Sequence, residues 1–143
     1  MQEIIQRAWN YDVRHDFDYS LIKKIADNCG SKTVKNSIGY LSFIHYHTKN
    51  KFWCMIVDES AFIAGTFAKN HFRLIEIAVD KEKQNAGYGK FMISELFQEC
   101  IERNVYQVTF RTPMNESSHL WYEKLGAKKI GITKDDYEMR FNI

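Results

Sequence analysis

The chain of 143 residues has little of what marks metal sites, secreted scaffolds or membrane proteins. Its cysteines, Cys29, Cys54 and Cys100, are odd in number and far apart, so they form neither a Cys-x-x-Cys metal pattern nor a balanced disulfide framework. We interpret them as reduced, buried thiols. No apolar stretch approaches the roughly 20 residues of a membrane-spanning helix, and the N-terminus lacks the basic and apolar segments of a signal peptide. We therefore expect a cytoplasmic location.

An excess of one charge is also lacking. Twenty basic residues face 18 acidic ones for a net charge of +2, and no basic tract is longer than two residues. A nucleic-acid partner therefore has no electrostatic footprint. What is present is a hydrophobic content of 45% and an aromatic content of 15%, which suits one compact core. No repeat, low-complexity segment or linker divides the chain, so we expect a single α/β domain over residues 1–143.

The most informative segment is a glycine-containing turn between two patterned runs. It consists of Gln84, Asn85, Ala86, Gly87, Tyr88 and Gly89. Before it, residues 74–79 are apolar except for Glu76, which is typical of a strand buried on both faces. After it, apolar residues recur at helical spacing over residues 92–101. Glycine pairs also occur in plain turns, but a turn that joins a strand to a helix start presents free N–H groups and favours a bound phosphate.

The remaining elements follow from periodicity and turn residues. Strands are predicted over residues 4–9, 52–57, 61–68, 105–111, 128–132 and 137–141. Helices are predicted over residues 19–28, 34–44 and 115–125. Asp18 is the expected N-cap of the first helix, and Pro113 is expected to end the strand before the last helix. The short polar connection at residues 58–60 predicts a hairpin.

Two motifs together resemble the GCN5-related N-acetyltransferase (GNAT) family. The turn matches the family pattern Q/R-x-x-G-x-G/A at every defined position. The second motif is Asn115 followed by Leu120-Trp121-Tyr122-Glu123-Lys124-Leu125-Gly126-Ala127, similar to the family's Leu-Tyr-x-x-Leu-Gly-Phe ending, with Trp121 inserted and Ala127 in place of the usual aromatic residue. The resemblance covers about half of the chain, from residue 74 to residue 128.

This resemblance implies a GNAT-type α/β (α+β) fold: a mixed, mostly antiparallel central sheet of six to seven strands, with splayed central strands and about four flanking helices. It also implies acetyl-CoA as cosubstrate, and no metal. Backbone groups of Ile77, Ala78 and Val79 would hold the pantetheine arm. The pyrophosphate would lie on the loop and helix start formed by Gln84, Asn85, Ala86, Gly87, Tyr88, Gly89 and Lys90. Asn115 would meet the cofactor near the opened strands, or would cap the following helix.

The resemblance implies that Tyr122 protonates the departing coenzyme A thiolate. A phenol with an ordinary pKa of about 10 can serve a basic alkyl thiolate. Without the family match, the favoured interpretation of Trp121, Tyr122 and Leu125 is that they are core residues on a buried helix face. The matching reaction is direct transfer of the acetyl group to a primary amine, with a backbone N–H of the 74–79 strand steadying the oxyanion. No cysteine is paired with a histidine in sequence, so an acyl-cysteine route has no support.

The acceptor amine must also lose a proton. An alkyl ammonium with a pKa of about 10.4 is neutral in roughly one part in 2,500 at pH 7, equivalent to about 4.6 kcal/mol of barrier. Glu76 is the candidate base, because burial in the central strand would raise its pKa. It could instead be a carboxylate satisfied by Arg73 or Lys69, or could face a water-filled groove without a catalytic role. The strand before Asn115 offers no acid of its own.

Three histidines are weaker candidates. His119 lies three residues before Tyr122 and could relay a proton, or could simply be a surface or packing residue. His45 and His47 would share a face if their segment were extended, as residues of an acceptor pocket; two histidines alone are poor evidence for metal.

The acceptor itself has no readable motif. We expect its pocket between residues 18–47 and 132–137, with an aromatic approach made by Tyr40, Phe43, Tyr46 and Trp53, and small-molecule and peptide amines both stay open. Two other classes stay open as well. One is a non-catalytic acyl-CoA sensor of the same fold. The other is a nucleotide-binding module, although the loop lacks the Lys-Ser/Thr ending of a P-loop and the third glycine of a Rossmann fingerprint. The family resemblance is compatible with a homodimer.

Overall fold

A computed structural model describes residues 11–143 of the chain. The strand predicted over residues 4–9 lies outside this range. The elements in chain order are β1 (Val13–Arg14), α2 (Tyr19–Asp27), α3 (Lys32–His47), β2 (Phe52–Val57), β3 (Ala61–Phe67), β4 (Phe72–Val79), the short 3₁₀ helix η1 (Lys81–Lys83), α4 (Tyr88–Glu102), β5 (Gln107–Pro113), α5 (Ser118–Lys124), β6 (Lys128–Thr133) and β7 (Asp136–Asn142). The strands form one sheet in the order β1-β2-β3-β4-β5-β7-β6.

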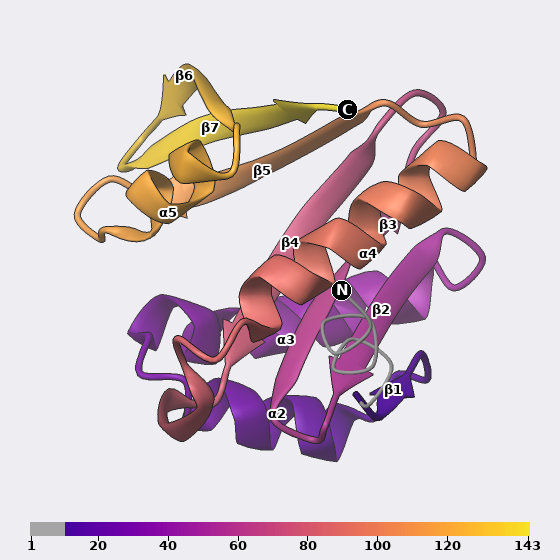
Figure 1. Cartoon of the computed structure of the whole chain (residues 1–143), viewed down its shortest axis with the longest axis vertical. Helices are drawn as coiled ribbons and strands as arrows, with labels where there is room; N and C mark the ends of the chain where they lie inside the picture. Colours follow the sequence, from indigo (N-terminus) through magenta and orange to yellow (C-terminus); the bar gives the residue numbers. More distant parts are fainter. Residues whose placement is uncertain (1–10) are drawn as a thin grey trace, which may run out of the picture.

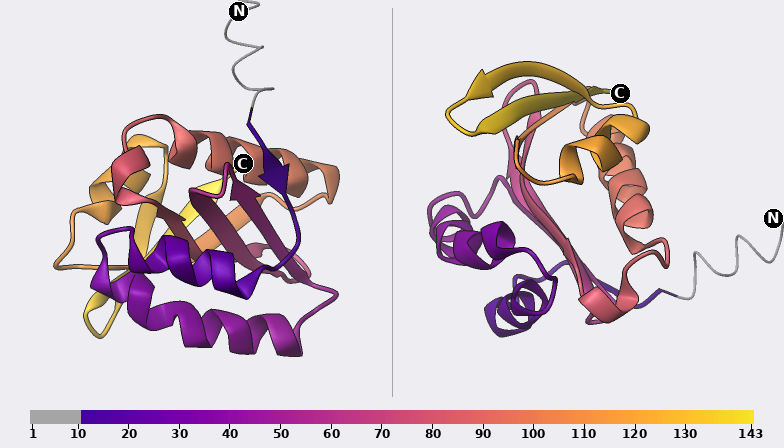
Figure 2. Two further views of the ribbon diagram at one scale, coloured as in Figure 1. Left: turned by 90° about the horizontal axis from the view of Figure 1, so that it is seen from below. Right: turned by 90° about the vertical axis from the view of Figure 1, so that its left-hand side faces the viewer.

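The sheet is antiparallel except for the β4–β5 pair, so the predicted mixed, mostly antiparallel GNAT-type sheet is confirmed. Figure 2 shows α2 and α3 on one face and α4 and α5 on the other. The two faces have separate cores. One is built around Met92, Leu96 and Phe110 under α4 and α5, and the other around Ile22, Leu41 and Phe62 under α2 and α3. No helix within residues 11–143 has the length and apolar character needed to cross a membrane.

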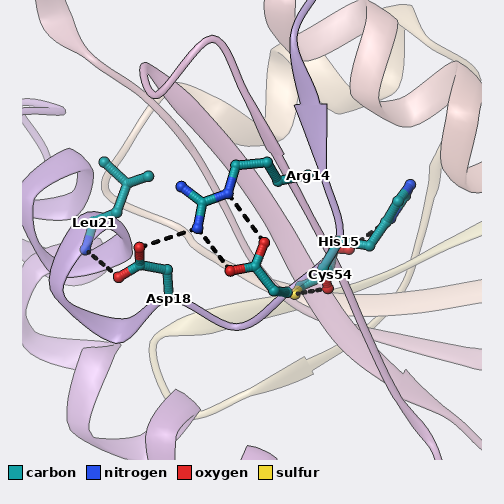
Figure 3. A network of polar contacts seen from close by, with 6 residues as sticks. Arg14, His15, Asp18, Leu21 and Cys54 are labelled. Carbon is teal, nitrogen blue, oxygen red and sulfur yellow. Dashed lines mark hydrogen bonds and ion pairs between the residues drawn. The ribbon is translucent and has the colours of Figure 1, made fainter.

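A polar network fixes the start of α2 (Figure 3). The Asp18 side chain accepts a hydrogen bond from the Leu21 N–H at 3.2 Å, so the predicted N-cap is confirmed. Arg14 donates to the carboxylates of Asp16 and Asp18, at 2.7 Å and 3.2 Å. The His15 ring nitrogen lies 3.0 Å from a backbone carbonyl of β2. This network ties the segment between β1 and α2 to the edge of the sheet.

The second helix is longer than predicted. It begins after Ser31, whose side chain accepts from the Val34 N–H, and it continues through His47. His45 and His47 are therefore helical. The segment is not extended, so the two side chains do not share a strand face. The His45 ring instead stacks on Phe17, with 4.1 Å between the ring centroids. Once the first turns have formed, each further residue adds one backbone hydrogen bond. The helix therefore extends through the alternating residues 45–47.

The C-terminal half differs from the prediction mainly at the start of α5. This helix begins at Ser118 after the N-cap Ser117, so the interpretation of Asn115 as its N-cap is wrong. Asn115 lies in the turn that follows Pro113, which ends β5 as predicted. The final strand pair is confirmed, with β6 and β7 antiparallel. The hairpin of β2 and β3 is confirmed as well.

The two central strands, β4 and β5, diverge along their length. β4 and β5 pair only at Phe72 with Val108 and at Arg73 with Thr109, although β4 continues to Val79 and β5 to Pro113 (Figure 1). Beyond these pairs, the β5-facing side of β4 has no strand partner. The predicted splay is therefore confirmed.

A β-bulge in β4 lies just where the strands separate. Gly65 of β3 is opposite Leu74, and Ala64 is opposite Glu76, so Ile75 is the additional residue. Ile75 packs against the core under α3, and the Glu76 carboxylate reaches Ser37 of α3. Two successive side chains thus turn toward the same helix, which regular alternation along a strand forbids. The bulge decides which face of the sheet receives the carboxylate.

Candidate active site

A cavity of about 430 Å³ occupies the gap between the separated strands. Its lining comes from four parts of the chain: the end of β4, the glycine turn with the end of η1 and the start of α4, the β5–α5 region, and the α2–α3 loop with the first turn of α3. These residues are Ile75, Glu76, Ile77, Ala78 and Val79; Lys83, Gln84, Asn85, Gly87, Tyr88, Gly89 and Lys90; Arg111, Thr112, Pro113, Glu116, Ser118, Trp121 and Tyr122; and Cys29, Ser31, Thr33 and Val34. Most of the residues that the sequence predicted for the site therefore line one cavity.

The glycine turn leaves backbone donors free at the start of α4. Asn85 and Gly87 adopt left-handed backbone conformations, with φ of 65° and 90°. Gly87 is the N-cap of α4 and supplies no side-chain hydrogen bond to the first turn. The N–H groups that open a helix have no intrahelical partners, so those of Tyr88, Gly89 and Lys90 are free to bind an anion. This geometry fits a phosphate group.

Two of the predicted binding residues do not reach the cavity, and a third has another task. Ala86 and Asn115 are exposed and lie outside the cavity lining. The Gln84 amide nitrogen donates to the backbone carbonyls of Cys29, at 2.8 Å, and Val79, at 3.1 Å. Gln84 thereby fastens the glycine turn to the end of β4 and to the α2–α3 loop.

The Tyr122 side chain enters the cavity from the α5 side. It is 8% exposed, and its ring packs on Phe110, with 4.4 Å between the centroids. The Tyr122 side chain belongs to the core, as one interpretation expected, and it also lines the cavity. Its role as a proton donor stays a prediction. No hydrogen-bond partner reaches its hydroxyl from residues 11–143. Burial, and secondarily the charge of Glu76, raise the pKa of the phenol, so the hydroxyl keeps its proton.

The Glu76 carboxylate is half-buried on the α3 side of the cavity. One oxygen lies 2.8 Å from the Ser37 hydroxyl, and the other accepts from the Ile77 N–H at 3.2 Å. Burial raises the pKa of Glu76 to about 7. The Ser37 hydroxyl also lies 2.9 Å from the Val34 carbonyl, yet it has one hydrogen to donate. A protonated Glu76 resolves this, because it can donate to Ser37 while Ser37 donates to Val34.

Arg73 does not satisfy the Glu76 carboxylate. It pairs instead with Glu138 of β7, which also has Arg111 at 3.6 Å. Glu76 and Tyr122 approach the cavity from opposite faces of the sheet. The first contacts α3, and the second packs with the residues under α4 and α5. The separation of β4 and β5 lets both faces open into the same space.

Glu116 was not anticipated from the sequence. Its carboxylate accepts hydrogen bonds from Ser31, at 3.2 Å, and Thr33, at 2.8 Å. It therefore joins the β5–α5 turn to the N-terminus of α3 across the cavity, where the helix dipole favours an anion. Its charge contributes to the raised pKa of Glu76. The sequence carries little signal for this contact, because the two partners of Glu116 are more than 80 residues away along the chain. The one local hint is an acidic residue in the turn before α5.

Trp121 was also read differently from the sequence. It lines the cavity and is 37% exposed, so it is not a core residue. Its indole lies against Gly89, where a Cβ atom would be only 2.9 Å from the ring. The second glycine of the turn is thus required by a protein side chain.

The remaining candidates lie elsewhere. His119 packs against Tyr137 and is 3.6 Å from Glu123, away from the cavity lining. Tyr40, Phe43 and Tyr46 are exposed on α3, and Trp53 lines a separate cavity of about 420 Å³ beside His15 and His45. In the part of the chain that the structure covers, no three His, Cys, Asp or Glu side chains gather as a metal site would require.

Comparisons with known proteins agree with this architecture. A family model described as "Acetyltransferase (GNAT) family" matches residues 2–127. No curated protein sequence matches the chain. Among solved structures, the PaiA N-acetyltransferase from Thermoplasma acidophilum in complex with coenzyme A has a TM-score of 0.78 at 13% identity, covering 94% of this chain and 99% of that one. The ribosomal-protein-S18-alanine N-acetyltransferase from Escherichia coli has a TM-score of 0.74 at 16% identity, covering 93% and 94%.

Proposed function

This chain belongs to the acetyltransferase (GNAT) family, and we propose on that basis that it transfers the acetyl group of acetyl-CoA to a primary amine. Three structural neighbours are complexes with coenzyme A. The observation that carries the proposal is the pairing of two proton-handling groups in one cavity. Glu76, with a pKa of about 7, and the protonated Tyr122 enter it from opposite faces of the sheet.

The donor fits the glycine turn and the free side of β4. Its pyrophosphate would lie on the N–H groups of Tyr88, Gly89 and Lys90, with the Lys83 and Lys90 ammonium groups beside it. The amides of its pantetheine arm would pair with backbone groups of residues 77–79, which line the cavity and have no partner on β5. The acetyl thioester would then lie between Glu76 and Tyr122. In this arrangement the Ile77 N–H exchanges its contact with Glu76 for one to the ligand.

The chemistry is a direct transfer. Glu76 removes a proton from the acceptor ammonium, and the neutral nitrogen attacks the thioester carbonyl carbon. A backbone N–H of β4 stabilises the oxyanion. The C–N bond forms as the C–S bond breaks, and Tyr122 gives its proton to the coenzyme A sulfur. The second proton of the attacking nitrogen then restores the Tyr122 phenol, and the proton held by Glu76 leaves to solvent. The acceptor approaches from the α3 face, because Glu76 contacts that helix while the donor occupies the α4 side.

The proposal leaves open which class of amine accepts the acetyl group. The neighbours include an enzyme that acetylates the alanine of a ribosomal protein and an aminoglycoside 6'-N-acetyltransferase. Both names state an N-acetylation, of a protein in one case and of an aminoglycoside in the other. A cytoplasmic location and a homodimer stay predictions, which fractionation and size-exclusion chromatography would check.

The test is thiol release from acetyl-CoA in the presence of a panel of peptide and small-molecule amines. Turnover by the wild-type chain is expected, and Tyr122→Phe should lower kcat by about a hundredfold to ten-thousandfold with unchanged donor binding. Tyr106→Phe, an exposed tyrosine on the far end of the domain, is the matched control. Donor binding without turnover by any amine would favour the acyl-CoA sensor. Tighter binding of ATP or NAD than of acetyl-CoA would contradict the proposal altogether.

The base has a separate test in the pH profile. For the wild type, kcat/KM should rise with pH through about 7, the pKa of Glu76, because the base must be unprotonated. Glu76→Gln should lose most of its activity together with this rise. An unchanged profile in the variant would remove Glu76 from the mechanism while leaving the transferase proposal intact.

A further inference from the structure

Trp121 reaches from α5 to the first turn of α4. An ideal Cβ on Gly89 would lie 2.9 Å from the indole Cζ2 atom and 3.1 Å from Cη2, so the ring rests directly against the glycine backbone. Gly89 is the second residue of α4, and its N–H is one of the free donors of the glycine turn. The indole therefore borders the group of donors that is best placed to hold a phosphate.

The indole is held there by its neighbours and remains open to the cavity. Its ring contacts that of Tyr122 with 5.0 Å between the centroids at 69°, and Tyr122 is itself fixed on Phe110. Trp121 is nevertheless 37% exposed, and it lines the same cavity as Gly89. A large side chain that packs on a glycine and keeps an open face has room for a ligand beside it.

We propose that the Trp121 indole forms one wall of the donor's phosphate cradle, and that it binds the pyrophosphate end of acetyl-CoA by shielding the N–H groups of the first turn of α4 from water. This inference rests on the proposed function. An apolar wall beside N–H donors lowers the local dielectric constant, so each hydrogen bond to an anionic oxygen becomes stronger. The flat face of the ring also limits where the phosphate can lie.

Gly89 is then needed for space and not for its backbone conformation. Its φ is not in the left-handed region, so alanine could adopt its backbone conformation. What alanine lacks is space, because its methyl group would meet the indole. The structure thus predicts that Gly89→Ala acts through Trp121, by pushing the ring away from the cradle.

The first experiment compares two donors. Acetyl-CoA contains the pyrophosphate, and S-acetyl-pantetheine does not. Trp121→Ala should raise the KM for acetyl-CoA by about tenfold and leave kcat/KM for S-acetyl-pantetheine unchanged. Trp121→Phe should restore most of the affinity, because it keeps an aromatic wall. Leu120→Ala, an exposed neighbour on α5, is the control and should change neither value.

Other outcomes overturn the inference. An equal loss with both donors would mean that Trp121 acts through Tyr122 or through the fold, and no loss with either would mean that the indole is not part of the cradle. Thermal midpoints of each variant identify a folding defect, and circular dichroism checks that the helices persist. If the wild-type chain fails to bind acetyl-CoA in calorimetry, the proposed function fails, which is a result separate from a Trp121 variant that binds normally.

A double-mutant cycle tests the role of the glycine. Gly89→Ala alone should weaken acetyl-CoA binding about as much as Trp121→Ala, and the double variant should be no worse than either single one. Losses that multiply would show that Gly89 serves the ligand independently of the indole, which would overturn this coupling. Intrinsic fluorescence gives a direct readout: emission should change when coenzyme A is added to the wild type, and the change should disappear in Trp121→Phe.

Discussion

Replacing Glu76 with glutamine should make the protein more stable at alkaline pH while lowering its activity. Glutamine has the shape of the protonated acid and can donate to Ser37, which then donates to the Val34 carbonyl. The wild-type carboxylate must instead be ionised within a half-buried site above pH 7. The substitution therefore removes a buried charge without leaving a cavity.

The size of the effect follows from the pKa. Burial raises the pKa of Glu76 from 4.5 to about 7, a difference equivalent to about 3 kcal/mol at about 1.4 kcal/mol per pH unit. Because the folded state holds the proton more tightly, stability falls as pH rises from about 4.5 to about 7, and the whole loss is present above that range. Water in the adjoining cavity reduces the penalty, so about 1 to 3 kcal/mol is expected at pH 8.

Urea denaturation of both proteins at pH 4.5 and pH 8 measures this difference. The free energy of unfolding of Glu76→Gln relative to wild type should increase between the two pH values by the amount above. Glu102→Gln, at the exposed end of α4, should show no comparable increase. A Glu76→Gln difference that stays constant with pH would refute the argument that burial holds this carboxyl neutral.

Three further outcomes follow from contacts described above. Gly65→Ala should destabilise the fold by about 3 kcal/mol in urea denaturation, because its Cβ would lie 2.2 Å from a backbone carbonyl oxygen of β4; an unchanged midpoint would contradict this. Glu116→Ala should cost about 1 kcal/mol of stability and lower the apparent pKa of the activity profile, since it removes a negative charge near Glu76. Cys29, Cys54 and Cys100 should react slowly with a thiol reagent at pH 8 and rapidly in urea, because burial raises the pKa of each thiol; fast labelling of the folded chain would refute their burial.

The sheet was largely predictable because its signals are local. Residues 52–57 and 61–68 are apolar runs around a polar turn, and the structure pairs them as a hairpin. The end of α3 was harder, because His45, Tyr46 and His47 alternate over too few residues to distinguish a strand from the last turn of a helix. The preceding helical turns decide between helix and strand here, because a formed helix propagates at little cost. A pattern read over these three residues alone does not include those turns.

The site was predictable where a motif or a charged residue in an apolar strand marked a position, as for Tyr122 and Glu76. Tyr122 and the glycine turn came from the family pattern, and Tyr122 and every residue of the turn except Ala86 line the cavity. The face that Glu76 occupies depends on the bulge at Ile75, which has no glycine or proline to mark it. Asn115 missed the cavity because α5 begins at Ser118, and the contacts of Glu116 and Trp121 join segments that are distant in sequence.

The separation of β4 from β5 also gives the molecule an edge strand in its interior. Free strand edges on a protein surface invite pairing with other chains, and proteins protect them with charges, bulges or covering loops. Here the free side of β4 faces a cavity whose other wall is β5 and α5, and Glu116 bridges the cavity to α3. To pair with the free side of β4, a second polypeptide strand would have to displace β5 and α5. A thin extended molecule could enter the cavity and pair with β4 without displacing them. The fold thus keeps the pairing capacity of an edge while hiding it from the partners that cause aggregation.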